Sequence, residues 1–322
     1  MIEPVDSLRI DVLIDNVTDG LSSAPTWAPS EFLGALRRGN RPASGRALCC
    51  AVHGLSLLLT AQRDGQTHTV LFDTGPEDYA LERNVGRLKA ELAAVEAIVL
   101  SHGHWDHCGG VLTALAACAR PSRRIQVYTH PDMFHTRALR LPNGIVSVMD
   151  DSPSQSDMVN AGAELVITDE AQDLLDAMFY LSGEIPRVTG FEPGMLGQLR
   201  RASDDNDWET DEVMADERWL GVQVAGKGLV VLTACSHAGV INVLRDAARA
   251  FGEVPLYGVL GGLHLSGPSE QFITTTVDAL ADFDLRLIGP AHCTGWRAVT
   301  ALANRFGDHV VVPSAVGRTY QF

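Results

Sequence analysis

The segment HGHWDH holds four side chains that can bind a metal ion, namely those of His102, His104, Asp106 and His107. Neutral imidazoles and a carboxylate are suitable donors for zinc, iron or manganese. Gly103 lets the backbone turn, so the first two histidines can converge on one ion, and the last two residues could serve a second. Burying four such donors without a metal would leave several polar groups needing partners. The spacing therefore predicts a metal-dependent enzyme with one or two divalent transition-metal ions.

Later histidines occupy a repeated position in the chain, because each lies in a short loop directly after a predicted strand. They are His237 in CSHAG, His264 in GGLH and His292 in GPAHCTG. The loop FDTG, with Asp73, also ends a strand, and its Thr-Gly pair suits a tight turn in which a carboxylate accepts backbone N–H groups. We therefore expect Asp73 to be buried and structural rather than bound to metal.

The elements around these loops alternate between strands and helices, which is the pattern of an α/β fold. The predicted strands are 10–14, 54–60, 69–73, 97–101, 125–129, 219–225, 229–234, 256–260, 285–288 and a closing strand at 309–312. The predicted helices are 77–94, 109–119, 239–251, 269–282 and 295–306. The histidine loops thus follow strands, where ligands of α/β proteins bind.

Residues 130–218 fit this alternation poorly, and we expect an insertion or lid, part of which covers the site. The interval ends in an acidic run between Asp204 and Glu217, which is typical of a solvated loop. The whole chain, 1–322, is otherwise expected to form a single domain.

The composition excludes several classes of function. A formal net charge of −15 repels phosphate backbones and anionic lipid, which argues against nucleic-acid and membrane partners. The first residues, MIEPVDSLRI, show no secretion signal, and no apolar run reaches the ~20 residues that span a bilayer. We therefore expect a cytoplasmic protein with reduced thiols that acts on a small molecule, and no feature indicates an oligomeric state.

The HGHWDH loop after a strand resembles the HxHxDH signature of the metallo-β-lactamase superfamily, and the resemblance covers nearly the whole chain. It implies an αββα four-layer sandwich with metals at one edge of the two sheets, here with the insertion between the second and third metal motifs. FDTG resembles the first motif, in which the aspartate supports the metal loop. The resemblance also implies two ligand sets, which are His102, His104 and His237 for one ion, and Asp106, His107 and His292 for the other.

Longer segments are similar to one branch of the superfamily, the dihydropterin–aminobenzene ribofuranosyl phosphate synthase-like family known from methanopterin biosynthesis. These segments are HGLS at 53–56, SHGHWDHCGG at 101–110, YLSGEIPR at 180–187, ACSHAGVIN at 234–242, GGLHL at 261–265 and HCTG at 292–295. By this resemblance His53, Glu184 and Arg187 are candidates for substrate contacts. A salt bridge that shapes the insertion would equally explain Glu184 and Arg187.

One position departs from the superfamily pattern. Most dinuclear members have a bridging aspartate between the third and final histidines, but the aspartates of 238–291 lie on or next to predicted helices. His264 ends a strand there, and we infer that it occupies the place of the bridging carboxylate; a supporting or core histidine is the alternative. Cys108, Cys235 and Cys293 adjoin ligand histidines, and because adjacent side chains often point away from each other, we expect small buried cysteines.

The predicted centre indicates a metal-dependent hydrolase or transferase. A divalent ion lowers the pKa of bound water towards ~7, and the resulting hydroxide attacks an ester or phosphoester centre. Asp106 is a candidate for orienting it, and His264 is a second catalytic candidate. Because Asp106 is the one anionic ligand, we expect a small anionic substrate with a phosphate or carboxylate group, with a pterin-related compound as one option. The alternatives are a mononuclear iron oxygenase on this fold and a non-catalytic, metal-stabilised ligand sensor.

Overall fold

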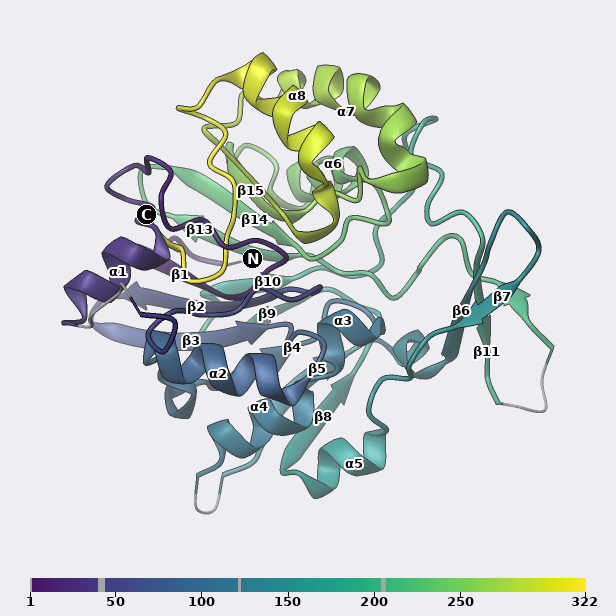
Figure 1. The fold of residues 1–322 in the computed structure, drawn as a ribbon, viewed down its shortest axis with the longest axis horizontal. Helices are drawn as coiled ribbons and strands as arrows, with labels where there is room; N and C mark the ends of the chain where they lie inside the picture. Colours follow the sequence, from purple (N-terminus) through teal and green to yellow (C-terminus); the bar gives the residue numbers. More distant parts are fainter. Residues whose placement is uncertain (1, 40–43, 121–122, 204–206) are drawn as a thin grey trace.

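The computed structural model describes residues 2–39, 44–120, 123–203 and 207–322. Over these residues the chain forms two large β-sheets that face each other, with helices on both outer sides and a small sheet projecting at one edge (Figure 1). The arrangement is the predicted αββα sandwich, and the histidine loops lie along the edge nearest the small sheet.

The first large sheet has the strand order β17-β1-β2-β3-β4-β5-β8. The strands from β17 to β3 pair in antiparallel fashion, and those from β3 to β8 pair in parallel. Its members are β1 (Ser7–Ile14), β2 (Ser56–Arg63), β3 (Gln66–Phe72), β4 (Ala97–Val99), β5 (Ile125–Thr129), β8 (Ala163–Ile167) and β17 (Thr319–Gln321).

The second large sheet has the order β16-β15-β14-β13-β10-β9, in which β14, β15 and β16 run parallel. Its members are β9 (Gln172–Leu174), β10 (Phe179–Leu181), β13 (Leu220–Val224), β14 (Gly228–Thr233), β15 (Leu256–Gly262) and β16 (Leu287–Ala291). The small sheet consists of β6 (Thr136–Arg140), β7 (Val146–Val148), β11 (Gln198–Arg201) and β12 (Glu209–Thr210).

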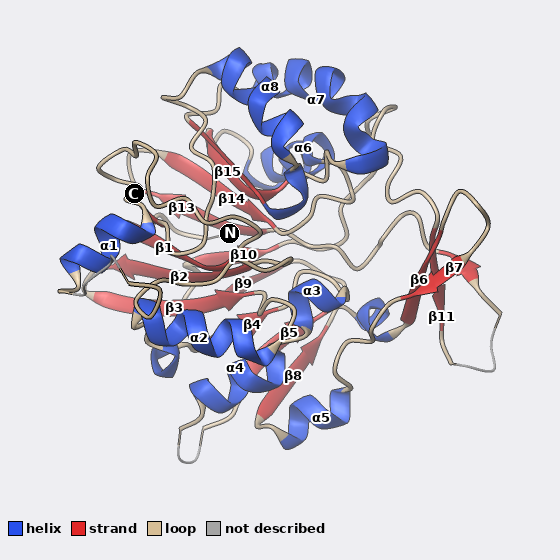
Figure 2. Cartoon of the chain, viewed as in Figure 1, coloured by secondary structure: helices blue, strands red, loops and turns tan. Residues whose placement is uncertain are grey.

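Helices cover the outer face of each large sheet (Figure 2). They are α1 (Glu31–Arg37), α2 (Asp78–Leu88), α3 (Trp105–Cys108), α4 (Val111–Cys118), α5 (Gln155–Asn160), α6 (Val240–Phe251), α7 (Ile273–Leu280) and α8 (Trp296–Phe306). Short 3₁₀ turns at η3 (Gly267–Phe272) and η4 (Ala281–Phe283) flank α7, so the predicted helix 269–282 is less regular than expected.

Three apolar clusters separate these four layers. The central cluster includes Leu57, Phe72, Leu232 and Leu260 and lies between the sheets, while the other two lie beneath the helices of either side. Burying each such side chain stabilises the fold by about 1.5–3 kcal/mol before entropy is counted. The sheets are therefore held rigidly enough to fix the loops at their ends.

The structure corrects two details of the expected architecture. Residues 309–312 contribute only an isolated bridge from Val311 to Ile288, and the closing strand is β17 instead. Within 130–218, β8, β9 and β10 are strands of the two large sheets, so this interval supplies part of the sandwich as well as the projecting small sheet. These strands are short, only three to five residues, which is why their periodicity is hard to recognise. In the part of the chain that the structure describes, no helix has the length and apolar character to cross a bilayer.

Candidate metal centre

One histidine group joins the loop after β4 to the loop after β14. His102, His104 and His237 offer ligand atoms that all lie within 4.8 Å of one another. Nε2 of His102 is 3.1 Å from Nδ1 of His104, and the His237 ring lies 4.8 Å and 4.9 Å from the centroids of these two rings. The structure therefore brings together the three residues expected to share one ion.

A second group lies beside the first and includes a residue from the loop after β16. Oδ2 of Asp106 is 3.2 Å from Nε2 of His292 and 3.7 Å from Nε2 of His107, and these two nitrogens are 3.3 Å apart. The ring centroids of His102 and His107 are 4.4 Å apart, so the two groups are direct neighbours. The second expected ligand set is thus also assembled.

Close packing explains the glycine between the first two histidines. A Cβ atom on Gly103 would lie 2.2 Å from the carbonyl oxygen of Met133 and 2.3 Å from Nη1 of Arg137. The backbone N–H of Gly103 donates to Oδ2 of Asp216, at 2.8 Å. The glycine is therefore required because buried groups approach the loop closely, and this steric reason adds to the turn that the sequence suggested.

Asp73 is buried and structural, as predicted. Its carboxylate accepts hydrogen bonds from the backbone N–H of Ser101 at 2.7 Å, from the Ser101 hydroxyl at 2.8 Å and from Nδ1 of His107 at 2.7 Å. The same hydroxyl lies 2.8 Å from Nδ1 of His102. Asp73 therefore orients one histidine of each group and leaves the Nε2 atom of each ring free to bind an ion.

Glu217 provides an equivalent support on the other sheet. Its carboxylate accepts hydrogen bonds from the backbone N–H groups of His237, at 2.7 Å, and Ala238, at 2.6 Å, and contacts Nδ1 of His237 at 3.0 Å. Burial alone would raise the pKa of Glu217, but the neighbouring His237 and the Ala238 N–H hold that pKa below its usual range. Glu217 is therefore a carboxylate that orients a histidine of the first group.

This role corrects the interpretation of the acidic run as a solvated loop. Asp207 and Glu209 are exposed, but Asp211, Asp216 and Glu217 are buried. Asp216 lies 2.8 Å from Nη2 of the buried Arg137, so its charge is paired. Asp204 and Asp205 lie outside the described residues. A run of acidic residues is exposed to solvent only where no buried cation or N–H group pairs with its carboxylates. The sequence alone does not show which residues are such partners.

Neutral partners hold the two remaining histidines. Nδ1 of His292 contacts Oδ1 of Asn16 at 2.9 Å, and the amide nitrogen of Gln198, on β11, lies 3.1 Å from Nε2 of His104. When Nδ1 of His104 binds an ion, Nε2 carries the proton and needs an acceptor. Oε1 of Gln198 is buried without a partner among the described residues, and turning the amide over would place this oxygen as the acceptor.

The donor set fits a metal ion. Each of the five histidines has one ring nitrogen fixed by a neighbour and the other directed towards the shared space. Burial lowers the pKa of His102 and His104, so both are neutral near pH 7, as ligands must be. Burial opposes the charge on His107, but Asp106 and Asp73 raise its pKa to about 9. These carboxylates favour a cation at this position, whether a proton or a metal ion.

Four residues of these loops have strained backbone conformations. Asp73, Ser236, His264 and His292 adopt positive φ angles of 58°, 57°, 45° and 46°. Each such conformation costs on the order of 1–3 kcal/mol and persists only where the surroundings enforce it, commonly at functional sites. Positive φ angles also occur elsewhere, for example throughout 175–177, and what these four residues share is their place after β3, β14, β15 and β16.

The three candidates for substrate contact are placed differently. His53 faces the site, with Nε2 3.3 Å from Oδ2 of Asp106, and this contact raises the pKa of His53. Glu184 is largely exposed and lies 3.5 Å from Nε2 of His130. Arg187 donates hydrogen bonds to the carbonyl groups of Ile185, Val213 and Met214, so it shapes the insertion.

His264 lies beside the first group and next to a cavity. Its ring centroid is 4.6 Å from that of His237. A cavity of about 220 Å³ is lined by His264 together with Leu139, Met195, Ser266 and Phe272, among other residues. Nδ1 of His264 is buried and has no hydrogen-bond partner in the described chain. His264 therefore joins the first histidine group to this cavity.

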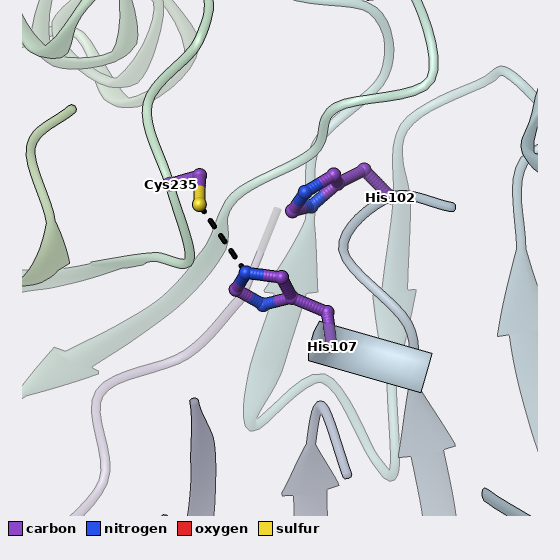
Figure 3. Close-up of side chains that lie close together, drawn as sticks. All are labelled: His102, His107 and Cys235. Atoms are coloured by element: carbon purple, nitrogen blue, oxygen red, sulfur yellow. Dashed lines mark hydrogen bonds between the residues drawn. The ribbon is translucent and has the colours of Figure 1, made fainter. Parts of the chain in front are cut away.

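The cysteines near the histidines are buried, as expected, but they do not all point away from the site. Sγ of Cys108 turns to the carbonyl group of His104, at 3.0 Å. Sγ of Cys235 instead points towards His107 and lies 3.2 Å from its Nε2 atom, beside His102 (Figure 3). Adjacent side chains often point away from each other, and this holds for Cys108, which directly follows His107. Cys235 lies two positions before His237, so the same rule does not apply to it.

Comparisons with known proteins indicate the family. A family model described as a beta-lactamase superfamily domain matches residues 68–156. The chain is 27% identical to 7,8-dihydropterin-6-methyl-4-(beta-D-ribofuranosyl)-aminobenzene-5'-phosphate synthase of Methanocaldococcus jannaschii. The 258 aligned residues cover 80% of this chain and 85% of that protein. It is 30% identical over 253 residues to an uncharacterised protein of the same organism, over 79% of this chain and 88% of the relative.

A solved structure supports the fold. The structure of a metal-dependent hydrolase of the beta-lactamase superfamily matches 97% of this chain and 98% of its own length, with a TM-score of 0.70 and 22% sequence identity. The motifs, the fold and the relatives agree, and the chain belongs to the metallo-β-lactamase superfamily, within which it is similar to the dihydropterin–aminobenzene ribofuranosyl phosphate synthase-like family.

Proposed function

We propose that the protein is a metal-dependent hydrolase or transferase that acts on a small molecule bearing a phosphate or carboxylate group. The observation that supports this most strongly is the convergence of two ligand sets, in which each histidine has its outer nitrogen fixed by a neighbour. His102, His104 and His237 would hold one ion, and Asp106, His107 and His292 a second. When bound, divalent ions supply Lewis acidity and lower the pKa of water to about 7.

Residues of the chain would orient the reactants. Oδ2 of Asp106 faces His53, His107 and His292, so this oxygen is fixed and can accept a hydrogen bond from the nucleophilic water. His53 is the exposed partner, with 58% of its side chain accessible, and is therefore placed to contact the substrate. His264 would bind a polar group in the 220 Å³ cavity that it lines, whose other walls are largely apolar.

Two buried carboxylates reduce the positive charge on which the expectation of an anionic substrate depends. Asp106 is the one anionic residue of the two proposed ligand sets, but Asp73 and Glu217 lie directly behind His107 and His237. They reduce the positive charge that the ligands alone would leave at the centre. We therefore expect a preference for anions that depends on direct coordination to a metal ion more than on a long-range field.

Transfer chemistry on a reduced pterin is a second candidate. It is supported by the name of the relative that shares 27% identity and by the YLSGEIPR segment, which forms part of β10 and the loop after it. Binding of reduced pterins, compared with simple phosphate esters, separates this candidate from general hydrolysis.

Metal removal tests the proposal. Protein purified without oxygen should contain zinc, iron or manganese and should turn over at least one phosphate ester, lactone or reduced pterin. A chelator should abolish this turnover, and addition of the metal should restore it. His102→Ala should match the chelated enzyme, whereas the exposed His309→Ala should match the wild type. Turnover that survives both chelation and His102→Ala would refute metal dependence, and consumption of oxygen would favour an oxygenase.

A further inference from the structure

The sulfur of Cys235 lies inside the cluster of metal-binding side chains. Cys235 follows β14, and its Sγ atom is 3.2 Å from Nε2 of His107. This nitrogen is the one that His107 has available, because its Nδ1 atom is bound to Asp73. Cys235, His102 and His107 form a group whose ligand atoms all lie within 4.8 Å (Figure 3). The thiol therefore lines the space in which an ion would sit.

The position of this sulfur is central to the site. Cys235 also forms a group with His237 and His264, and another with His292 and Cys293, each within the same 4.8 Å limit. It is thus shared by groups that reach all three histidine loops after β14, β15 and β16. The sequence predicts His264 for the place of a bridging carboxylate, but the group that contains His264 includes no residue of the second ligand set, whereas the sulfur of Cys235 lies next to His107 of that set.

The distance is compatible with shared coordination. Zinc binds imidazole nitrogen at about 2.0–2.1 Å and thiolate sulfur at about 2.3 Å, so two such ligands in tetrahedral geometry lie roughly 3.6 Å apart. The observed 3.2 Å separation differs from this by a few tenths of an ångström. Only a small movement of the side chain is needed to place both atoms on one ion.

The loop holds the thiol in this orientation. Ser236 adopts a positive φ of 57°, and its hydroxyl donates to the carbonyl group of Gly262 at 2.8 Å. Cys235 and His237 lie on either side of this fixed residue. Sγ of Cys293 lies 3.4 Å from Sγ of Cys235 and can donate a hydrogen bond to it. Such a donor stabilises a thiolate and would tune its strength as a ligand.

We propose that Cys235 binds metal as a thiolate at the junction of the two histidine groups, and that Cys293, which among the described residues shares a group with the single histidine His292, acts as its hydrogen-bond donor rather than as a ligand. The inference rests on the proposed metal dependence. A soft sulfur ligand favours zinc or iron over manganese, so it narrows the three metals that the imidazoles alone would allow. It also supplies negative charge that the centre lacks without a bridging carboxylate.

Spectroscopy tests the proposal without relying on activity. Protein loaded with cobalt(II) should show an intense near-ultraviolet sulfur-to-metal charge-transfer band. Cys235→Ser should lose this band while keeping the weaker visible bands of cobalt bound to imidazole. Cys293→Ser should keep the charge-transfer band, shifted in energy. Cys108→Ser is the matched control, because Cys108 is a buried neighbour of the site whose sulfur faces the His104 carbonyl and Ser152.

X-ray absorption of the wild-type zinc protein gives a second measurement, which remains decisive if a variant fails to fold. A sulfur scatterer at about 2.3 Å from zinc is expected. Zinc surrounded only by nitrogen and oxygen, with no charge-transfer band in the cobalt protein, would overturn the role of Cys235 and leave metal dependence intact. A wild-type protein that binds neither metal would overturn both. Cys235→Ser should weaken zinc binding by more than the roughly 10–100-fold expected for loss of an outer partner.

Discussion

Asp73 and Glu217 orient histidines on opposite sides of the centre in nearly the same way. Each buried carboxylate receives three hydrogen-bonding contacts, of which one comes from Nδ1 of a histidine and the others from the loop that carries a histidine. Asp73 follows β3 of the first large sheet, whereas Glu217 precedes β13 of the second. Two loops that belong to different sheets therefore fix an imidazole in the same way.

The two carboxylates differ in how far their influence extends. Asp73 contacts His107 directly and reaches His102 through the Ser101 hydroxyl, so it affects both histidine groups. Glu217 contacts His237 alone among the proposed ligands. Similar local geometry thus predicts unequal consequences for the two groups, and substitutions can test this difference.

Asp73→Ala should have the largest effect. It leaves three buried donors without an acceptor, and removing one partner of a buried charged pair typically costs about 3–5 kcal/mol of stability. Metal retention should fall towards the upper end of the ~10–100-fold range for outer partners, at both ions. Denaturant unfolding and metal analysis measure the two effects. Glu82→Ala, on an exposed part of α2, is the control and should stay within about 0.5 kcal/mol of the wild type. Loss of one ion alone would contradict the prediction that Asp73 affects both histidine groups.

Glu217→Ala should have the second-largest effect. Retention of the ion at His102, His104 and His237 should fall by ~10–100-fold, and retention of the second ion should change little. Glu209→Ala, an exposed acid of the same run, should change neither stability nor metal content. Equal loss of both ions would contradict the prediction that Glu217, unlike Asp73, affects one histidine group only.

The same residue makes a prediction about acid stability. Its folded-state pKa is held low, so its contribution to stability is fully present above the unfolded-state value of about 4.3 and is lost as pH falls through the lower folded-state value. The difference in unfolding free energy between wild type and Glu217→Gln should therefore shrink as the solution is acidified below about pH 4.3. A difference that is constant down to pH 2 would show that hydrogen-bond geometry, rather than ionisation, is what Glu217 provides.

The contrast also shows what a sequence can reveal about such a site. Asp73 was recognisable because the whole motif is local, with a strand, a turn-forming Thr-Gly pair and a resemblance to a known motif. Glu217 stands among other acids that face solvent, and its partner lies 20 positions away. Nothing in the local pattern distinguishes it from Glu209. The sandwich and the histidine loops follow from periodicity, whereas long-range pairings depend on how the sheets come together.

Cys235 and Gln198 were missed for related reasons. The position of Cys235, two residues before His237, is compatible with a side chain on the same side, but a buried apolar environment was an equally good explanation. Gln198 belongs to the interval 130–218, where three-residue and four-residue strands carry too few residues to show a pattern. Its contact with His104 shows that the small sheet forms part of the wall of the site.

The smallest effect is expected at Asn16, which holds His292 as the two carboxylates hold their histidines. Its Oδ1 atom lies 2.9 Å from Nδ1 of His292 and also accepts the backbone N–H of Gly54 at 3.0 Å. A neutral amide fixes the direction of the ring but adds little to the basicity of its other nitrogen. Asn16→Ala should therefore weaken retention of the second ion by only about 10-fold, the lower end of the range for outer partners.

Asn16→Asp converts this third support into a copy of the other two. A carboxylate at the same place accepts the imidazole N–H more strongly and makes His292 a better ligand, so the second ion should bind more tightly than in the wild type. The nearby carboxylates of Asp15 and Asp106 oppose a further negative charge, and Asn16 Nδ2 would no longer donate to the His292 carbonyl, so the gain should be small. Competition with a chromophoric chelator measures both variants against the wild type. Tighter binding in the alanine variant than in the aspartate variant would mean that charge behind the imidazole is not what fixes the ion, and the parallel between Asp73 and Glu217 would then be one of geometry alone.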